Sequence, residues 1–340
     1  MKKGILLVNL GSPDSPFPKD VKRYLGEFLM DERVIDIPYF LRALLVKGII
    51  LNTRPKKSSR AYQKVWLPEG SPLIVLSNKL LEKVKPLVAA PVEMAMRYGN
   101  PSLESGFEKL QAQGVTDVLL VPLYPQHAMA TTETIVVLAE ELIKKRFTNM
   151  KMETVPAFYH RISYIQALSA SIQESMDAFN PDYLLFSYHG VPERHIRKTD
   201  CTGEHCKMND TCCITPSAAH AVCYRHQCHE TTRRVAETLG LKEGEYGTSF
   251  QSRLGRDPWL KPYTDATLVA LGEKGVKKLA VATPAFVADC LETIEEIGME
   301  GAHEFKEAGG GEFLTIPCLN DRDDWAQTLS SWIHDYLNKA

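Results

Sequence analysis

The sequence lacks long apolar runs and has no excess of charge of either sign. No run approaches the roughly 20 apolar residues that a helix needs to span a bilayer, and the formal net charge is -2 at pH 7. Without a basic excess, nucleic acid is not expected as a partner. The apolar start, residues 5–8, is too short for a secretory signal, and no small-residue cleavage site follows it. We therefore interpret it as a first strand and expect a cytoplasmic protein.

Three motifs of common enzyme classes are also missing. The chain has no Gly-x-x-x-x-Gly-Lys-Ser/Thr loop for ATP and no Gly-x-Gly-x-x-Gly turn for a dinucleotide. The Gly-x-Ser-x-Gly turn of α/β-hydrolases is absent as well. These absences argue against ATP-driven reactions, a nucleotide cofactor and serine-hydrolase chemistry.

What the chain does contain is a repeated order of strands and helices. Its 340 residues, 44% of them hydrophobic, are enough for two α/β domains with cores of their own. The first half shows strand, helix, strand and helix at 92–97, 103–113, 118–125 and 131–145. The second half repeats this order at 246–250, 265–274, 279–286 and 290–297. Alternating strands and helices predict parallel sheets.

We therefore expect an α/β fold of two similar doubly wound, Rossmann-like domains whose parallel sheets face a central cleft. The expected domains are 1–160 and 161–340, and the second carries a cysteine-rich insertion at 200–228. The last helix, 325–337, is expected to pack back on the first domain. Open sheets of this kind bind ligands at the carboxyl ends of their strands, so the chemistry is expected there.

Residues 39–51, which follow a predicted helix at 17–29, are apolar on most sides. A buried helix is one interpretation. The other is an amphipathic lip beside an apolar pocket, able to make peripheral contact with a membrane. The basic residues that follow, 54–60, are interpreted as a solvated loop that can also meet carboxylates of a ligand.

An apolar strand is predicted to end at His189. Residues 184–188 are mostly apolar, and the Gly-x-Pro sequence at 190–192 breaks regular structure. His189 is then the last side chain of a strand, at the edge where ligands bind. A histidine that is simply hydrogen-bonded in the core is the alternative.

A ladder of carboxylates follows the predicted strand at 279–286. Asp289, Glu292 and Glu296 are separated by three and four residues and would share one face of a helix. A solvated first turn favoured by the helix dipole is the alternative. Their mutual repulsion predicts that at least one keeps its proton near neutral pH, as an acid/base group or a handler of divalent metal.

The sequence resembles the ferrochelatases, which insert ferrous iron into a porphyrin to make haem. The resemblance covers nearly the whole chain. It rests on motifs found in order at 9–13, 97–101, 124–127, 186–192, 250–260, 283–286 and 291–296. It implies an enzyme of the lyase class whose substrates are Fe²⁺ and protoporphyrin or coproporphyrin. The oligomeric state stays open.

The resemblance also implies roles for single residues. His189 would be the central catalytic residue, as a base or a metal ligand, and Glu292 would face it across the porphyrin. Glu296 and Asp289 would continue an acidic path for iron or protons. The porphyrin-binding residues would be Leu10, Arg54, Tyr98, Trp259 and Phe286. The chain departs from several relatives at Cys290, where they carry histidine.

Six of the eight cysteines lie between 201 and 228, in a polar segment without periodicity that predicts a loop. A reducing compartment argues against disulfides. The open possibilities are free thiols, a zinc site with His205, His220, His226 or His229, and a [2Fe–2S] cluster, which some ferrochelatases carry. Four of five cysteines are the candidate cluster ligands: Cys206, Cys212, Cys213, Cys223 and Cys228.

Two other functions remain compatible with these features. One is a cobalt or nickel chelatase that acts on a different tetrapyrrole. The other is a non-catalytic carrier of haem or a siderophore, since two-domain clefts also serve periplasmic binding proteins. A carrier of that kind is expected to have a cleaved signal sequence, and the apolar start does not resemble one.

Overall fold

The computed structural model describes residues 2–253, 255 and 257–339. Leu254 and Arg256, which belong to the motif at 250–260, lie outside the described residues. The chain divides into two compact units. Unit 1 consists of Met1–Tyr124, Met129–Pro156 and Asn320–Ala340, and unit 2 consists of Pro125–Ala128 and Ala157–Leu319.

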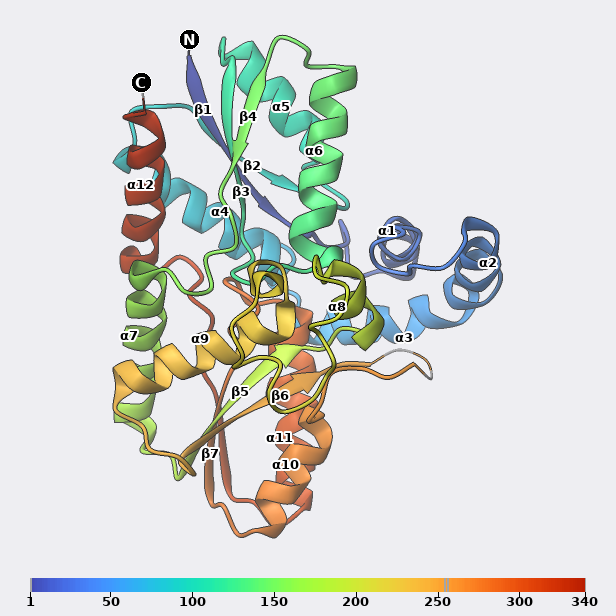
Figure 1. The fold of residues 1–340 in the computed structure, drawn as a ribbon. Coiled ribbons are helices and arrows are strands. Elements are labelled where there is room, and N and C mark those ends of the chain that lie inside the picture. The colour runs from blue at the N-terminus through green and yellow to red at the C-terminus, as the bar shows by residue number, and fades with distance from the viewer. Residues whose placement is uncertain (1, 254, 256, 340) are drawn as a thin grey trace. The chain divides into compact units, whose positions relative to one another are not determined.

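Unit 1 is built on a parallel sheet whose strand order is β2-β1-β3-β4 (Figure 1). The strands are β1 (Lys3–Asn9), β2 (Val92–Met96), β3 (Asp117–Pro122) and β4 (Lys151–Thr154). The central strand β1 is an apolar run with no exposed surface at Ile5, Leu6, Leu7 and Val8. Such a run suits a parallel strand, because helices cover both faces of a parallel sheet. The helices of this sheet are α4 (Pro72–Val84), α5 (Leu103–Ala112), α6 (Thr134–Lys145) and α12 (Asp323–Leu337), with a short 3₁₀ turn η2 (Lys85–Leu87).

Unit 2 repeats this arrangement with the strand order β6-β5-β7-β8, again all parallel. Its strands are β5 (Tyr183–His189), β6 (Tyr246–Gln251), β7 (Lys278–Ala282) and β8 (Glu312–Thr315). Its helices are α7 (Ile162–Phe179), α8 (Glu193–Thr199), α9 (Tyr224–Leu239), α10 (Thr264–Glu273) and α11 (Ala302–Glu307), with the 3₁₀ turn η4 (Ala218–Ala221). The predicted α/β fold with two similar parallel sheets is confirmed.

The order of strands locates the edge where a ligand is expected in unit 2. The chain runs from β5 outward to β6 and then returns to place β7 and β8 on the other side of β5. Loops that leave the carboxyl ends of β5 and β7 therefore diverge, which opens a crevice at this switch point. His189 ends β5, and the segment with Phe286 and the acidic residues follows β7.

The predicted basic loop at 54–60 is wrong. A continuous helical stretch runs from α2 (Tyr39–Ala43) through the π-helix η1 (Leu44–Ile50) into α3 (Leu51–Val65), which contains Pro55. The buried side chains of α3 are Pro55, Ser59, Tyr62 and Val65. Their spacing of three and four residues makes one face, which packs on α1 (Pro18–Leu29). The helical period was present in the sequence but hidden by the charged residues of the solvated side.

Two segments predicted as α-helix form π-helices. The first is η3 (Met129–Glu133), which leads into α6, and the second is η5 (Glu292–Gly301), which leads into α11. The α-helix predicted at 290–297 is therefore wrong in type and in its start. A π-turn holds more residues than an α-turn, and Asp289 precedes the helix, so the three carboxylates do not share an α-helical face.

The cysteine-rich segment is only partly a loop. Residues 200–217 are without regular structure apart from turns, but Cys223 caps α9 and Cys228 lies within that helix. The buried positions of α9 recur at Tyr224, Gln227, Cys228 and Thr231, which is helical spacing. The loop prediction is wrong for Cys228, because the apolar face of α9 begins inside a polar stretch.

Candidate active site

The end of β5 in unit 2 holds His189 in one orientation. The imidazole Nδ1 lies 2.7 Å from the carbonyl oxygen of Gly190, so Nδ1 carries the proton and donates it. In the neutral ring the lone pair is then on Nε2. The Gly190 amide donates to the Gln251 carbonyl at 2.6 Å, which ties this turn to the end of β6. The arrangement presents Nε2 as a base or as a metal ligand.

Gly190 is required by close approach of the neighbouring backbone. A Cβ at this position would lie 2.9 Å from the Gln251 oxygen and 3.0 Å from the Ser252 oxygen. Both distances are too short for any other residue without movement of the main chain. The same Cβ would be 3.4 Å from the ring of Trp259, so the indole lies against this turn.

Aromatic rings and a buried amide complete this edge of unit 2. The ring of Phe286 lies edge-on to the His189 ring, with centroids 6.4 Å apart and an interplanar angle of 75°. The side chain of Gln251 accepts from Ser187 at 2.9 Å and donates to the Glu292 carbonyl at 3.2 Å. Gln251 thus joins β5, β6 and the start of η5, which brings His189 and Glu292 to the same edge.

Glu296 is the carboxyl group whose titration is displaced toward neutral pH. Burial, and after it the charge of Glu292, raise the pKa of Glu296 to about 7. The Ser252 hydroxyl donates to Glu296 at 2.5 Å, and Ser252 holds a left-handed backbone conformation with φ of 61°. A group with this pKa is present in both protonation states near pH 7, in line with the repulsion predicted from the sequence.

Asp289 is held by hydrogen bonds at the start of η5. Its carboxylate accepts from the Thr293 hydroxyl at 2.8 Å and from the Cys318 amide at 3.3 Å. Cys290 is buried, and burial raises the pKa of its thiol well above the usual range, as does the neighbouring charge of Glu292. Cys290 is therefore a neutral thiol in contact with Glu292.

In unit 1 the residues of three motifs meet at the carboxyl edge of the sheet. The Leu10 amide lies 3.2 Å from the Tyr124 hydroxyl, and the Leu10 carbonyl accepts from the Tyr98 amide at 2.8 Å. Gly11 has φ of 106°, and a Cβ there would lie 1.9 Å from the Tyr98 oxygen. No residue with a side chain fits at this crossing of β1 and β2.

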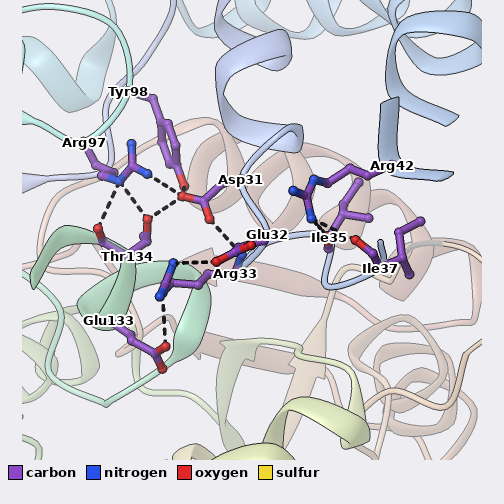
Figure 2. Close-up of polar contacts among 10 residues, drawn as sticks. All are labelled: Asp31, Glu32, Arg33, Ile35, Ile37, Arg42, Arg97, Tyr98, Glu133 and Thr134. Carbon is purple, nitrogen blue, oxygen red and sulfur yellow. Dashed lines mark hydrogen bonds and ion pairs between the residues drawn. The ribbon is translucent and has the colours of Figure 1, made fainter. Parts of the chain in front are cut away.

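In unit 1, Arg97 and Tyr98 both donate hydrogen bonds to the buried carboxylate of Asp31 (Figure 2). Asp31 accepts from Arg97 at 2.5 Å, from the Tyr98 hydroxyl at 3.0 Å and from the Thr134 hydroxyl at 2.5 Å. Burial alone would raise the pKa of Asp31, but the hydrogen bonds, led by the one from Thr134, and the Arg97 charge outweigh it and lower this pKa. Tyr98 is 2% exposed, and burial raises its pKa well above the usual range.

The helical stretch at 39–65 contains a buried, hydrogen-bonded arginine and several exposed apolar side chains. The buried Arg42 guanidinium donates to the carbonyls of Ile35 at 3.1 Å and Ile37 at 2.9 Å, as Figure 2 shows. Arg54 is exposed on α3. The lip, as we name the exposed apolar residues of this stretch, consists of Tyr39, Phe40, Leu41, Leu44 and Ile49. The alternative of a fully buried helix is wrong for these positions.

In the cysteine-rich segment, one thiol contacts two others. Cys223 lies within hydrogen-bond reach of Cys206 and Cys213, and the hydrogen bond from Cys213 lowers the pKa of the Cys223 thiol. Cys212 lies near Cys206 and Cys213, and Arg225 donates to its sulfur at 3.4 Å. All eight cysteines are free, and Cys201 is exposed.

Histidine side chains organise the backbone of this segment. The Nε2 atoms of His205 and His220 lie 2.6 and 2.9 Å from the Cys212 carbonyl oxygen. The Nδ1 atom of His226 lies 2.7 Å from the Cys213 carbonyl oxygen. The rings of His220 and His226 stack with centroids 3.6 Å apart. As these side chains stand, no group of three or more His, Cys, Asp or Glu residues could hold a metal ion anywhere in the described part of the chain.

Comparison with known proteins decides the family. The family model named ferrochelatase matches residues 2–337. The ferrochelatase of Stutzerimonas stutzeri strain A1501 is 49% identical over 330 residues, which are 96% of each chain. The ferrochelatase of Pseudomonas fluorescens strain Pf0-1 is 48% identical over 329 residues, again 96% of each chain. The chain belongs to the ferrochelatase family.

Ferrochelatases are lyases that insert Fe²⁺ into a porphyrin to form haem, and both the iron and the porphyrin are substrates. The resemblance drawn from the sequence is confirmed, and the non-catalytic carrier is set aside. A solved structure of SirB from Bacillus subtilis with Fe³⁺ has the same fold, with a TM-score of 0.56 at 13% identity over 98% of this chain and 95% of that chain. Among the described helices, none is long and apolar enough to cross a membrane.

Two residues that support these sites carried no recognisable signal in the sequence, and a third was marked only by its motif. Asp31 accepts hydrogen bonds from Arg97 and Tyr98, but it follows α1 and belongs to no motif. The hydroxyl of Tyr224 donates to the His189 carbonyl at 2.8 Å across 35 positions of sequence. Gln251 lies inside a family motif, which marked it without assigning a role.

Proposed function

We propose that His189 and Glu292 carry the metal-insertion step of this ferrochelatase. A porphyrin loses two pyrrole protons when Fe²⁺ enters, so the step needs a base and a route for the metal. The observation that carries the assignment is the His189 turn, where Nδ1–H is held by Gly190 and Nε2 carries the lone pair. Glu292, Glu296 and Asp289 then form an acidic path for iron or for the released protons.

For the porphyrin, we propose five binding residues: Leu10, Arg54, Tyr98, Trp259 and Phe286. Phe286 and Trp259 flank His189 and Gly190 and supply apolar surface in unit 2. Leu10 and Arg54 belong to unit 1, where an exposed guanidinium can bind a propionate. Tyr98 contributes through its backbone bond to Leu10 more than through ring surface, because its side chain is buried.

The direct test is insertion under anaerobic conditions with Fe²⁺, or with Zn²⁺ as a stable substitute, in the presence of protoporphyrin or coproporphyrin. We expect the Soret band to move to that of the metalloporphyrin over many turnovers, with two protons released per metal, measured with a pH indicator dye. A protein that only bound the porphyrin would give one stoichiometric spectral change without proton release. Comparison of the two porphyrins identifies the preferred substrate.

A [2Fe–2S] cluster bound by Cys206, Cys212, Cys213 and Cys223 is proposed for the cysteine-rich segment. The chemistry of the donor set supports it, because these four thiols lie near one another and Arg225 lies beside Cys212 and Cys213, where its charge favours thiolates. Cys228 is the less suitable candidate, since it is fully buried within α9. The side chains have to turn toward a common centre to hold the group. Bound there, a cluster would cross-link the segment.

This proposal predicts the metal content of the protein and of two serine variants. Anaerobically purified protein should be reddish-brown and contain about two irons and two sulfides per chain. Cys213→Ser should lose both colour and iron, whereas Cys201→Ser, which changes an exposed cysteine outside the group, should keep them. Colourless protein with stoichiometric zinc would favour the zinc alternative, and metal-free protein would remove the cluster.

We also propose a cytoplasmic enzyme that meets the surface of the inner membrane through the lip. The free state of all eight cysteines supports a reducing compartment. Phe40 is 74% exposed and Leu44 is 59% exposed, and apolar side chains this exposed on one helical stretch suit the interface of a bilayer.

Removing the lip side chains should weaken membrane binding without unfolding the protein. For Phe40→Ser with Leu44→Ser we expect at least ~10-fold weaker partition onto phosphatidylcholine–phosphatidylglycerol vesicles, because each large apolar side chain contributes roughly 1.5–3 kcal/mol when buried. The melting temperature should stay near that of the parent. Val46→Ser, at a fully buried position of η1, should lower the melting temperature and leave vesicle binding near that of the parent. Equal vesicle binding by the double variant and the parent would refute the membrane contact.

A further inference from the structure

The peptide unit between His189 and Gly190 is held at both ends. Its N–H donates to the Gln251 carbonyl at 2.6 Å, and its C=O accepts from the Tyr224 hydroxyl at 2.8 Å. The first contact comes from the neighbouring strand β6, and the second comes from the first residue of α9. With both polar groups bonded, the plane of this peptide cannot rotate without breaking a buried hydrogen bond.

The imidazole is held by the peptide unit that directly follows this one. His189 Nδ1 donates to the Gly190 oxygen, the next carbonyl along the chain. That carbonyl belongs to the following peptide unit, which is joined to the first at the Gly190 Cα. Without the Tyr224 bond, rotation about the ψ dihedral of His189 can displace Gly190 as a whole, including this carbonyl, and release Nδ1. The neutral ring can then exchange tautomers, and the lone pair no longer stays on Nε2.

We propose that Tyr224 is a positioning residue for His189, acting through the hydrogen bond from its hydroxyl to the His189 carbonyl. This inference rests on the proposed role of His189 and adds to it a residue from outside the family motifs. Tyr224 is buried, and burial raises the pKa of its phenol well above the usual range, so the hydroxyl remains a donor. The sulfur of Cys228, one turn further along α9, lies within reach of the same hydroxyl.

The placement of Tyr224 also connects His189 to the cysteine-rich segment. Cys223, whose thiol contacts Cys206 and Cys213, directly precedes Tyr224 and caps α9. The start of α9 is therefore fixed on one side by the thiol group and on the other by the turn that bears the imidazole.

The test compares two buried tyrosines whose hydroxyl groups form hydrogen bonds with different partners. Tyr224→Phe removes only the hydroxyl on the His189 carbonyl. Tyr188→Phe removes the hydroxyl of an equally buried neighbour, which bonds Thr232 at 2.9 Å instead. Each loses one buried hydrogen bond, so both should lower the melting temperature to a similar extent.

Only Tyr224→Phe should change the reaction. We expect kcat for Zn²⁺ insertion to fall roughly 10- to 100-fold, the range seen when a partner that orients a functional histidine is removed, with the KM for porphyrin unchanged. Tyr224→p-aminophenylalanine, which restores a donor at the same ring position, should recover part of the loss. Tyr188→Phe should keep the parent kcat.

A measurement that does not depend on turnover separates this inference from the catalytic proposal. The ¹⁵N signals of the His189 ring, assigned with His189→Ala, should report the Nδ1–H tautomer in the parent and in Tyr188→Phe. In Tyr224→Phe they should shift toward values averaged over both tautomers. Unchanged tautomer signals and unchanged kcat in Tyr224→Phe would overturn the positioning role, while insertion by the parent would leave the proposed function intact.

Discussion

Replacing His189 with alanine is expected to lower kcat for metal insertion about 10²- to 10⁴-fold, the usual contribution of a positioned acid/base group. The porphyrin should still bind with nearly the parent affinity, because in the proposed site apolar burial against residues such as Phe286 and Trp259 would supply most of the contact. The measurements are kcat from the Soret change with Zn²⁺ and porphyrin affinity from fluorescence quenching. The split between a lost kcat and a retained affinity identifies a group that acts in the chemical step.

His303→Ala is the matched control for this experiment. His303 lies in the same unit on α11, and its exposed side chain has Nε2 3.2 Å from the Glu307 carboxyl oxygen. Its loss should change neither kcat nor porphyrin binding, because exposed pairs of this kind contribute little. If His189→Ala turned over at a rate close to that of the parent, the central role of His189 would be wrong.

The second large effect is expected at Asp31, on the stability of unit 1. The Asp31 side chain is 5% exposed and neutralises Arg97, which is 18% exposed. Asp31→Asn leaves Arg97 largely buried without a counter-charge and should cost about 3 kcal/mol of unfolding free energy. For a unit of this size that corresponds to a fall in melting temperature of roughly 6–12 °C. Calorimetry or circular dichroism measures it.

Acid should abolish the difference between the parent and Asp31→Asn. The pKa of Asp31 is lowered in the folded state, so its stabilising effect is complete above the ordinary aspartate pKa of about 3.9. It is lost as the pH falls through the lower pKa of the folded state, because the unfolded chain then binds the proton first. Glu32→Gln, which changes an exposed neighbour paired with Arg33, should cost less than ~1 kcal/mol. Equal stability of Asp31→Asn and the parent at neutral pH would contradict the account.

Most strands and their order of appearance were predictable from the sequence, because they are short apolar runs closed by glycine and proline. The sequence pattern does not predict β4 and β8, whose residues are partly exposed. The prediction that β5 ends at His189 is confirmed, and the same pattern located β2, β3 and β7 within a few residues. Parallel strands are covered on both faces, so nearly every residue is apolar and the signal is strong. The repeat of this pattern also predicted two sheets of like order.

Helical segments were less predictable where one side faces water. The polar side of α3 masks the spacing of its buried positions, so the sequence around Pro55 predicts a loop. The widening of η5 into a π-helix left no mark in the hydrophobic period. The start of α9 is also polar on its exposed side, so the helical position of Cys228 could not be recognised from the sequence.

By itself, the sequence determined the fold class, the family and the residues at the ends of the strands, because these depend on local apolar runs and on motifs of adjacent residues. Only the tertiary structure decided which groups hold those residues in place. Asp31 reaches Arg97 across 66 positions and Tyr224 reaches His189 across 35. Their hydrogen bonds are formed by chain segments that the fold brings together, and no periodicity or spacing in the sequence records such a meeting.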